Sequence, residues 1–345
     1  MLKIGPLQFQ LPAVQAALSG YSDRAMRVVA RRWGAELAMA EVVLDQLILL
    51  RGKLRDRMLE IGEDDHPIGG QLMGAEPEQF GRAAAELVAH GYDLVDINFG
   101  CPVKKVLGRC RGGYLLTTPY TALDIVKSVL DQVGGRCPVT VKMRRGFDDS
   151  AESERNFFEI LDGAFDLGVA SITVHGRTVK QRYEGPSNRD FLTRAKRHAG
   201  DRTILGSGDV FTPEDVLAVM SETGVDGVWV ARGAIGNPFI FREVRALLEG
   251  RPLPPPPTVA EQRDAIDAHL RLTAEVYGAD RAGVVMRKVC IRYADLHPLA
   301  EDVRRAFIMA RTSSDVDEAL RRWYDPATDW PPVRRVERGA AALTE

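Results

Sequence analysis

The chain has 345 residues, of which 45% are hydrophobic and 27% charged, and its formal net charge at pH 7 is −2. This composition supplies one large core and a smaller second unit, and it excludes an overall electrostatic attraction to polyanions. No apolar run approaches the roughly 18 to 20 residues of a membrane span, and Asp23, Arg24 and Arg27 stand where a signal peptide would be apolar. We therefore expect a soluble cytoplasmic protein without membrane contact.

Eight short apolar or β-branched runs alternate with stretches whose apolar residues have helical spacing. Eight strand-then-helix units over about 245 residues match a (β/α)8 TIM barrel, whereas a doubly wound sheet usually has fewer strands. We therefore predict an α/β fold with a closed parallel barrel. The expected strands are Leu11–Leu18, Glu36–Val43, Pro67–Met73, Tyr92–Asn98, Pro138–Met143, Ala170–His175, Thr203–Gly206 and Val225–Val230.

The sequence also predicts where the barrel ends. Residues 251–257 read RPLPPPP, which cannot continue a helix and should form a stiff, extended linker. Residues 258–325 are rich in Ala, Leu, Arg and Glu and contain no strand-like run, so we expect three or four helices there. The predicted organisation is a barrel over 1–250, the linker, a small helical domain over 258–325 and an extended tail over 326–345.

Polar residues gather where the predicted strands end, which is where barrel enzymes place their active sites. Glycine-rich turns after the seventh and eighth strands, followed by a helix near Thr212, would let backbone N–H groups approach a phosphate. This arrangement predicts a phosphorylated cofactor. The strand-end residues are Gln71, Asn98, Cys101, Lys142, Arg144, His175, Arg177, Ser207, Gly208, Asp209, Ala231 and Arg232.

Four cysteines are present, at Cys101, Cys110, Cys137 and Cys290. Their number and irregular spacing fit neither a disulfide framework nor a CxxC metal site. We therefore expect no metal, and a functional cysteine must act alone. Only Cys101 has a setting at a strand end, so the other three are interpreted as structural.

Several motifs of this chain together resemble a known signature set. DINFGCPVKKV (96–106), GGYLL (112–116), VKMRRGF (141–147), VHGRT (174–178) and YEG (183–185) resemble, in order and spacing, those of the bacterial, flavin-dependent tRNA-dihydrouridine synthases. The segments LQFQLPAVQAALSGYSD (7–23) and WVARGAIGNPFIF (229–241) are similar to the two ends of the same barrel. The resemblance therefore covers nearly the whole chain.

This resemblance implies a two-step reaction. NADPH reduces bound FMN, and the flavin N5 then transfers a hydride to C6 of a uridine in tRNA. The cysteine of the GCP motif, Cys101, is implied as the donor of the proton to C5. An unperturbed thiol, with a pKa of about 8.5, is protonated near pH 7 and can serve as an acid.

The resemblance also implies binding roles. Lys142 would lie near the N1 and O2 edge of the flavin, and His175 and Gln71 would hydrogen-bond its ring or ribityl chain. Asn98 would present its amide to the uracil, with Arg144, Arg177 and Gln181 beside it. The other implied cofactor contacts are Ala17, Leu18, Ser19, Ser207, Gly208, Asp209, Ala231 and Arg232.

The helical domain is the expected tRNA-docking surface of a monomer. VVMRKVCIRYADLH (284–297) reads as one helix, on which Arg287, Lys288 and Arg292 lie near one face and could contact phosphates. The competing interpretation is an ordinary solvated face, because basic and acidic residues nearly balance in this domain.

Two alternative functions stay open. The first is an FMN barrel oxidoreductase that acts on a small molecule, which would need no helical domain. The second is a degenerate barrel that binds RNA without reducing it. The latter is suggested by departures from the family's usual pattern, in which Ala17-Leu18 replaces Pro-Met, Ser207 replaces Asn and Ala231 replaces Gly.

Overall fold

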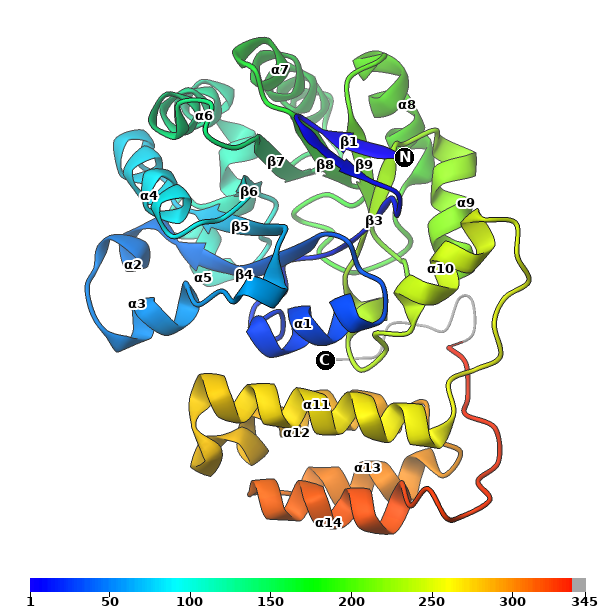
Figure 1. Ribbon diagram of the computed structural model, residues 1–345. Coiled ribbons are helices and arrows are strands. Elements are labelled where there is room, and N and C mark those ends of the chain that lie inside the picture. The colour runs from blue at the N-terminus through cyan, green and yellow to red at the C-terminus, as the bar shows by residue number, and fades with distance from the viewer. Residues whose placement is uncertain (337–345) are drawn as a thin grey trace.

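The computed structural model describes residues 1–336 and contains a closed barrel of eight parallel strands, as predicted (Figure 1). Each strand overlaps one of the expected runs. Around the barrel, β10 pairs with β3 and the remaining strands follow in chain order. The strands are β3 (Ala13–Gln15), β4 (Ala38–Leu44), β5 (Ile68–Met73), β6 (Leu94–Phe99), β7 (Val139–Arg144), β8 (Ser171–His175), β9 (Ile204–Ser207) and β10 (Gly227–Val230).

A hairpin that the sequence analysis missed covers the amino-terminal end of the barrel. Its strands, β1 (Leu2–Ile4) and β2 (Leu7–Phe9), pair antiparallel. Its turn lies against the starts of β7 and β8. A Cβ placed on Gly5 would be 3.1 Å from Pro138 Cβ and 3.5 Å from Ala170 Cβ, and these two residues directly precede the two strands. The hairpin thereby closes the barrel core opposite the carboxyl ends of the strands.

The barrel helices begin and end at residues that favour helix termini. Helix α9 begins with a capping box of Thr212 and Asp215, and α6, α7 and α9 end at Gly134, Gly168 and Gly224 in the left-handed conformation. The helices of the barrel are α1 (Arg24–Arg32), α2 (Asp45–Leu49), α3 (Lys53–Met58), α4 (Pro77–Ala89), α5 (Lys104–Leu107), α6 (Pro119–Val133), α7 (Ala151–Leu167), α8 (Arg189–Ala199), α9 (Pro213–Thr223) and α10 (Ile240–Leu248), with 3-10 turns η1 (Glu63–Asp65), η2 (Gly112–Thr117) and η3 (Arg232–Ala234).

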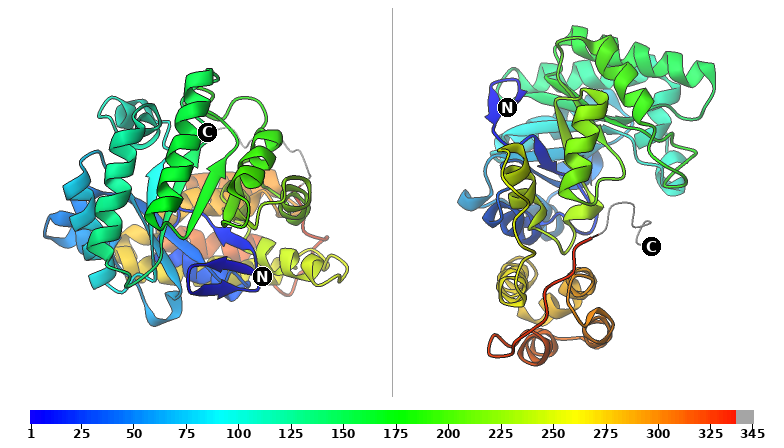
Figure 2. Two further views of the ribbon diagram at one scale, coloured as in Figure 1. Left: turned by 90° about the horizontal axis from the view of Figure 1, so that it is seen from above. Right: turned by 90° about the vertical axis from the view of Figure 1, so that its right-hand side faces the viewer.

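Four helices follow the extended segment 251–258 and form a bundle beside the barrel (Figures 1 and 2). The bundle shares an apolar cluster with α1, whose Ala25, Val28 and Val29 pack among the buried residues of the bundle. Its helices are α11 (Val259–Tyr277), α12 (Ala279–Ala294), α13 (Ala300–Met309) and α14 (Ser313–Trp323).

The boundaries of one predicted helix were wrong. The expected helix over 284–297 is α12, which begins five residues earlier, at Ala279, and ends at Ala294. Pro298 follows this end, and a residue before proline is sterically disfavoured in the helical conformation. No helix among residues 1–336 is long and apolar enough to cross a membrane.

The tail is packed against the bundle over its described part. Residues 325–336 contain no helix or strand, yet Val333 is buried and the Trp330 ring lies 5.2 Å from the His297 ring. Arg335 donates to the Pro254 carbonyl of the linker. The rest of the predicted tail, 337–345, lies outside the described residues.

Candidate active site

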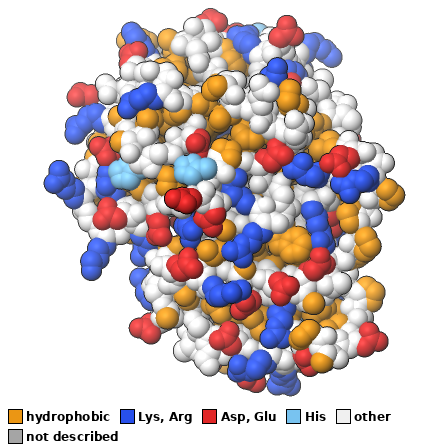
Figure 3. Space-filling model, in the orientation of Figure 1, with side chains coloured by type: hydrophobic (Ala, Val, Ile, Leu, Met, Phe, Trp, Pro, Cys, Tyr) orange, Lys and Arg blue, Asp and Glu red, His pale blue; other side chains and the backbone are white. Residues whose placement is uncertain are grey.

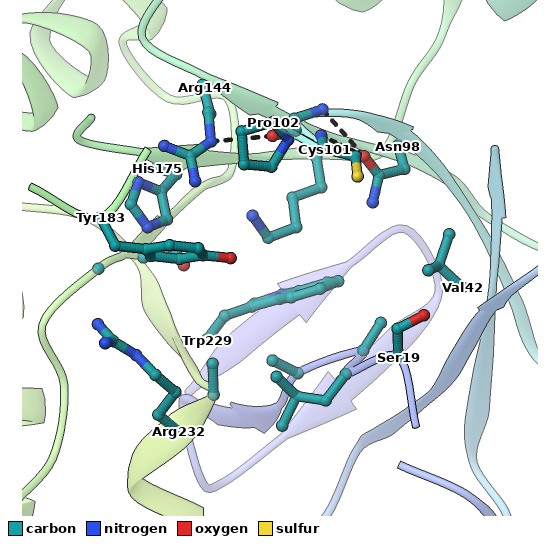
Figure 4. Close-up of a pocket in the computed structure, with 18 of the residues that line it drawn as sticks. Ser19, Val42, Asn98, Cys101, Pro102, Arg144, His175, Tyr183, Trp229 and Arg232 are labelled. Carbon is teal, nitrogen blue, oxygen red and sulfur yellow. Dashed lines mark hydrogen bonds between the residues drawn. The ribbon is translucent and has the colours of Figure 1, made fainter. Parts of the chain in front are cut away.

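A cavity of about 250 Å³ opens at the carboxyl ends of the barrel strands. Asn98, Cys101 and Arg144 line one side of it, and Ser19 and Arg232 line the opposite side (Figure 4). The structure thus brings together most of the residues that were predicted for the site. The predicted residues on its wall are Ala17, Leu18, Ser19, Gln71, Asn98, Cys101, Lys142, Arg144, His175, Ser207, Gly208, Asp209, Ala231 and Arg232.

A chain of buried hydrogen bonds runs from β5 and β6 to the cysteine. Gln71 Nε2 donates to Asp96 Oδ2 at 2.8 Å, and Asn98 Nδ2 donates to Gln71 Oε1 at 2.8 Å. Asn98 Oδ1 in turn accepts from the backbone N–H of Gly100 at 2.9 Å and of Cys101 at 3.1 Å. Burial raises the pKa of Asp96 to about 6. The network gives both amides a defined orientation and holds the turn that presents Cys101.

The cysteine turn is packed closely against the loop that follows it. A Cβ placed on Gly112 would be 2.8 Å from Cys101 Cβ, and Gly112 has a φ of +58°. Burial raises the pKa of the Cys101 thiol, and this effect outweighs the opposing charges of Arg144 and Lys142. The thiol therefore keeps its proton at neutral pH, as a general acid must.

Two hydrogen-bond donors face the cavity from β7 and β8. Lys142 Nζ lies 5.7 Å from the centre of the Trp229 ring, and no carboxylate among residues 1–336 forms an ion pair with it. Burial, with the nearby charge of Arg144, lowers the pKa of Lys142 to about 8. The Nδ1 atom of His175 accepts from the Arg177 N–H at 3.2 Å, so a neutral ring carries its hydrogen on Nε2. Burial and then Lys142 hold the pKa of His175 well below its usual range.

The turns after β9 and β10 are closely packed and form another part of the cavity wall. A Cβ on Gly208, whose φ is +113°, would lie 2.5 Å from Ser187 Oγ, and a Cβ on Gly233 would lie 2.6 Å from the Val210 carbonyl oxygen. Ala231 has a φ of −100° and a ψ of −99°, so it lies outside the positive-φ region that favours glycine. The guanidinium of Arg232 adds a positive charge beside this backbone. The donor set fits a planar, carbonyl-rich ligand with a phosphate group such as FMN.

Arg177 and Gln181 do not line the cavity, in contrast to the expected substrate contacts. Arg177 is 3% exposed, donates to Asp209 at 2.8 and 2.7 Å and also to the Gly185 carbonyl. Asp209 further accepts from the Ser187 N–H at 2.7 Å, so its carboxylate is occupied by protein donors. Gln181 Nε2 donates to the Glu184 carbonyl at 2.8 Å. Both side chains hold the 181–187 loop, since Arg177 donates to the Gly185 carbonyl and Gln181 to the Glu184 carbonyl.

Two aromatic residues of the site were missed by the sequence analysis. Tyr183 is 51% exposed at the cavity mouth, with the guanidinium carbons of Arg144 and Arg232 at 5.4 and 5.3 Å from its ring centre. Trp229 is almost fully buried and lies across the cavity (Figure 4). The alternation of a strand could have found Trp229, because it stands two residues before Ala231 and therefore shares its face.

The three cations predicted to dock RNA do not form one free surface. Lys288 Nζ donates to the Gly20 carbonyl and lies 4.9 Å from the centre of the Tyr21 ring. Arg292 lies 3.6 Å from Asp295, and its side chain is 18% exposed. Arg287 is partly buried. Two of the three therefore have partners within the protein, Lys288 in the barrel and Arg292 at the end of its own helix. Figure 3 shows basic and acidic side chains interspersed on the face in view.

Comparisons with known proteins agree with this geometry. The family model for dihydrouridine synthase matches residues 14–326. A tRNA-dihydrouridine synthase B from Xanthomonas axonopodis pv. citri is 35% identical, over 94% of this chain and 95% of its own. A probable tRNA-dihydrouridine synthase from Mycobacterium tuberculosis is 33% identical, over 98% of this chain and 88% of its own.

A solved structure shows the same fold at lower identity. Histamine dehydrogenase from Rhizobium sp. 4-9 matches with a TM-score of 0.55 and 14% identity, over 79% of this chain. The present chain spans about half of that dehydrogenase, 50% of its length, so this likeness concerns the barrel fold alone. The family match extends from β3 to the end of the bundle. The chain belongs to the dihydrouridine synthase family.

Proposed function

We propose that this protein reduces a uridine of tRNA to 5,6-dihydrouridine, with FMN as its bound cofactor and NADPH as the reductant. The observation that carries the proposal is the meeting of two groups in one cavity. These are a partly buried, protonated thiol at Cys101 and an ammonium at Lys142 that has no carboxylate ion-pair partner in the described chain. The names of the relatives support tRNA as the substrate.

The cavity offers separate places for the two ends of FMN. When bound, FMN would carry a hydride from NADPH to C6 of the uracil. Lys142 and the Nε2–H of His175 would donate to its carbonyl-rich edge, and the backbone around Gly208 and Ala231, with Arg232, would hold the phosphate.

The chain's own residues would handle the substrate and the proton. A uracil must leave the tRNA stack to enter the cavity, and the half-exposed Tyr183 ring at the mouth offers a surface on which a base can stack. Cys101 would give its proton to C5. Asn98 and the Arg144 Nε–H, which donates to the Gly100 carbonyl at 2.9 Å, hold the turn that carries this thiol.

The test of this function combines flavin binding with RNA mapping. The purified protein should bind FMN with a dissociation constant of micromolar or lower. Ser207 stands where the family usually has Asn. Each side-chain hydrogen bond to FMN lost through such a replacement costs about 0.5 to 1.5 kcal/mol of binding free energy, which weakens the affinity roughly tenfold at most. RNA from a strain that lacks the gene should lose dihydrouridine at one or more tRNA positions and regain it with the gene on a plasmid.

Different failures of this test exclude different functions. No FMN binding at micromolar concentration would contradict the enzymatic function and favour a barrel that only binds RNA. FMN binding with an unchanged dihydrouridine map would favour an oxidoreductase that acts on a small molecule.

A further inference from the structure

Helix α12 of the bundle contacts two loops that line the cavity. The first loop joins β3 to α1 and contributes Ala17, Leu18 and Ser19 to the cavity wall. The second follows β10 and contributes Ala231 and Arg232. The helical domain is therefore in contact with two loops that line the proposed cofactor site, although its residues follow the barrel in sequence.

Lys288 holds the first of these loops from the side of the bundle. Its ammonium donates to the carbonyl of Gly20, the residue that follows the cavity-lining segment, and also lies 4.9 Å from the centre of the Tyr21 ring. On the other side, the N–H of Gly20 donates to the carboxylate of Glu41 on β4. The peptide groups of Gly20 are thus bonded to two charged side chains, one from each domain.

The second loop rests directly on the α12 backbone. A Cβ placed on Gly236 would be 2.5 Å from the backbone nitrogen of Tyr293, and Gly236 has a φ of +68°. Tyr293 is almost fully buried in the cluster that the bundle shares with α1. The position of α12 relative to the barrel is therefore well defined. The backbone that carries Lys288 is held in place by this packing.

We propose that Lys288 is a positioning residue of the flavin pocket, which holds the Ala17–Ser19 wall through Gly20 instead of contacting an RNA phosphate. The inference rests on the proposed function, because it assigns FMN to this pocket. A cation bonded to a backbone carbonyl and adjacent to an aromatic face already has its preferred partners.

The experiment replaces Lys288 and a matched cation of the same helix. Lys288→Met removes the charge and keeps the aliphatic stem, and Lys288→Arg retains a donor. Arg281→Met removes an exposed charge from the first turn of α12, where Arg281 contacts no residue of the barrel through an ion pair or side-chain hydrogen bond. FMN affinity is measured by fluorescence titration, tRNA affinity as a function of salt concentration, and folding by the thermal unfolding midpoint.

The expected result is a selective effect on the flavin. Lys288→Met should weaken FMN binding by about three- to tenfold, because the Gly20 loop loses one charged hydrogen bond that is partly screened by solvent. Lys288→Arg should restore most of the affinity, and Arg281→Met should leave it unchanged. The salt slope of tRNA binding should stay the same in Lys288→Met. Glu41→Gln, which loosens the same loop from the barrel side, should also weaken FMN binding.

Several results would overturn the inference. One is unchanged FMN affinity in Lys288→Met, whether or not the tRNA salt slope falls by the 0.9 or so expected for one lost phosphate contact. Another is an equal loss in Arg281→Met, which would indicate a general effect of charge. If the wild-type protein itself fails to bind FMN, the proposed function fails as well. If it binds FMN and Lys288→Met binds equally well, only the role of Lys288 is refuted.

Discussion

Replacing Cys101 by alanine should slow uracil reduction by about 100- to 10,000-fold, which is the usual contribution of a general acid. FMN binding and NADPH oxidation should remain nearly unchanged, because the thiol is needed only when the uracil receives its proton. The thiol is partly buried and its pKa is raised, so it keeps the proton that this step requires. Single-turnover reduction of tRNA by the pre-reduced enzyme, compared with the pre-steady-state rate at which NADPH reduces the bound flavin in the absence of tRNA, separates the two half-reactions.

The matched control for this variant is Cys110→Ala. Cys110 is exposed on the loop that follows the cysteine turn, and it does not line the cavity. This variant should reduce tRNA at close to the wild-type rate. A full loss of activity in Cys110→Ala together with normal activity in Cys101→Ala would show that the other thiol is the acid.

Replacing Lys142 by methionine should weaken FMN binding by about 10- to 100-fold, the value of one or two hydrogen bonds from a charged donor in a buried site. The substitution should also change the pH dependence of binding. The pKa of Lys142 is lowered to about 8. The ammonium is therefore present below pH 8 and is lost as the pH rises above it.

This titration gives the wild-type protein a distinct pH profile. If FMN accepts a hydrogen bond from the Lys142 ammonium, it binds the protein in which Lys142 is protonated. The affinity for FMN should therefore be highest below pH 8 and fall by up to tenfold per pH unit above it. In Lys142→Met this fall should be absent. Fluorescence titrations between pH 7 and about pH 9.5 measure both profiles, and parallel profiles in the two proteins would exclude Lys142 as the titrating contact.

The candidate site was largely predictable because its residues stand at strand ends. The strand period and the alternation with helices identify eight strands, and barrel geometry brings their carboxyl ends together. Gln71, Asn98, Lys142 and His175 follow from that local pattern, and all line the cavity. The hairpin β1–β2 was missed because strands of three residues are too short to show a period.

The partners of the charged side chains were decided by the tertiary structure. Arg177 meets Asp209 from the next strand end, and Lys288 meets Gly20, which is 268 residues away in the chain. The residues next to Arg177 and Lys288 in the sequence do not indicate these contacts. From the sequence alone, both side chains are therefore interpreted as cations available to a ligand. Spacing along a strand or helix determines the face on which a side chain lies, since that depends on backbone geometry alone. Which group meets that face depends on how distant elements pack, and this is why the sequence by itself predicted the residues that line the cavity but could not predict that Lys288 donates to Gly20.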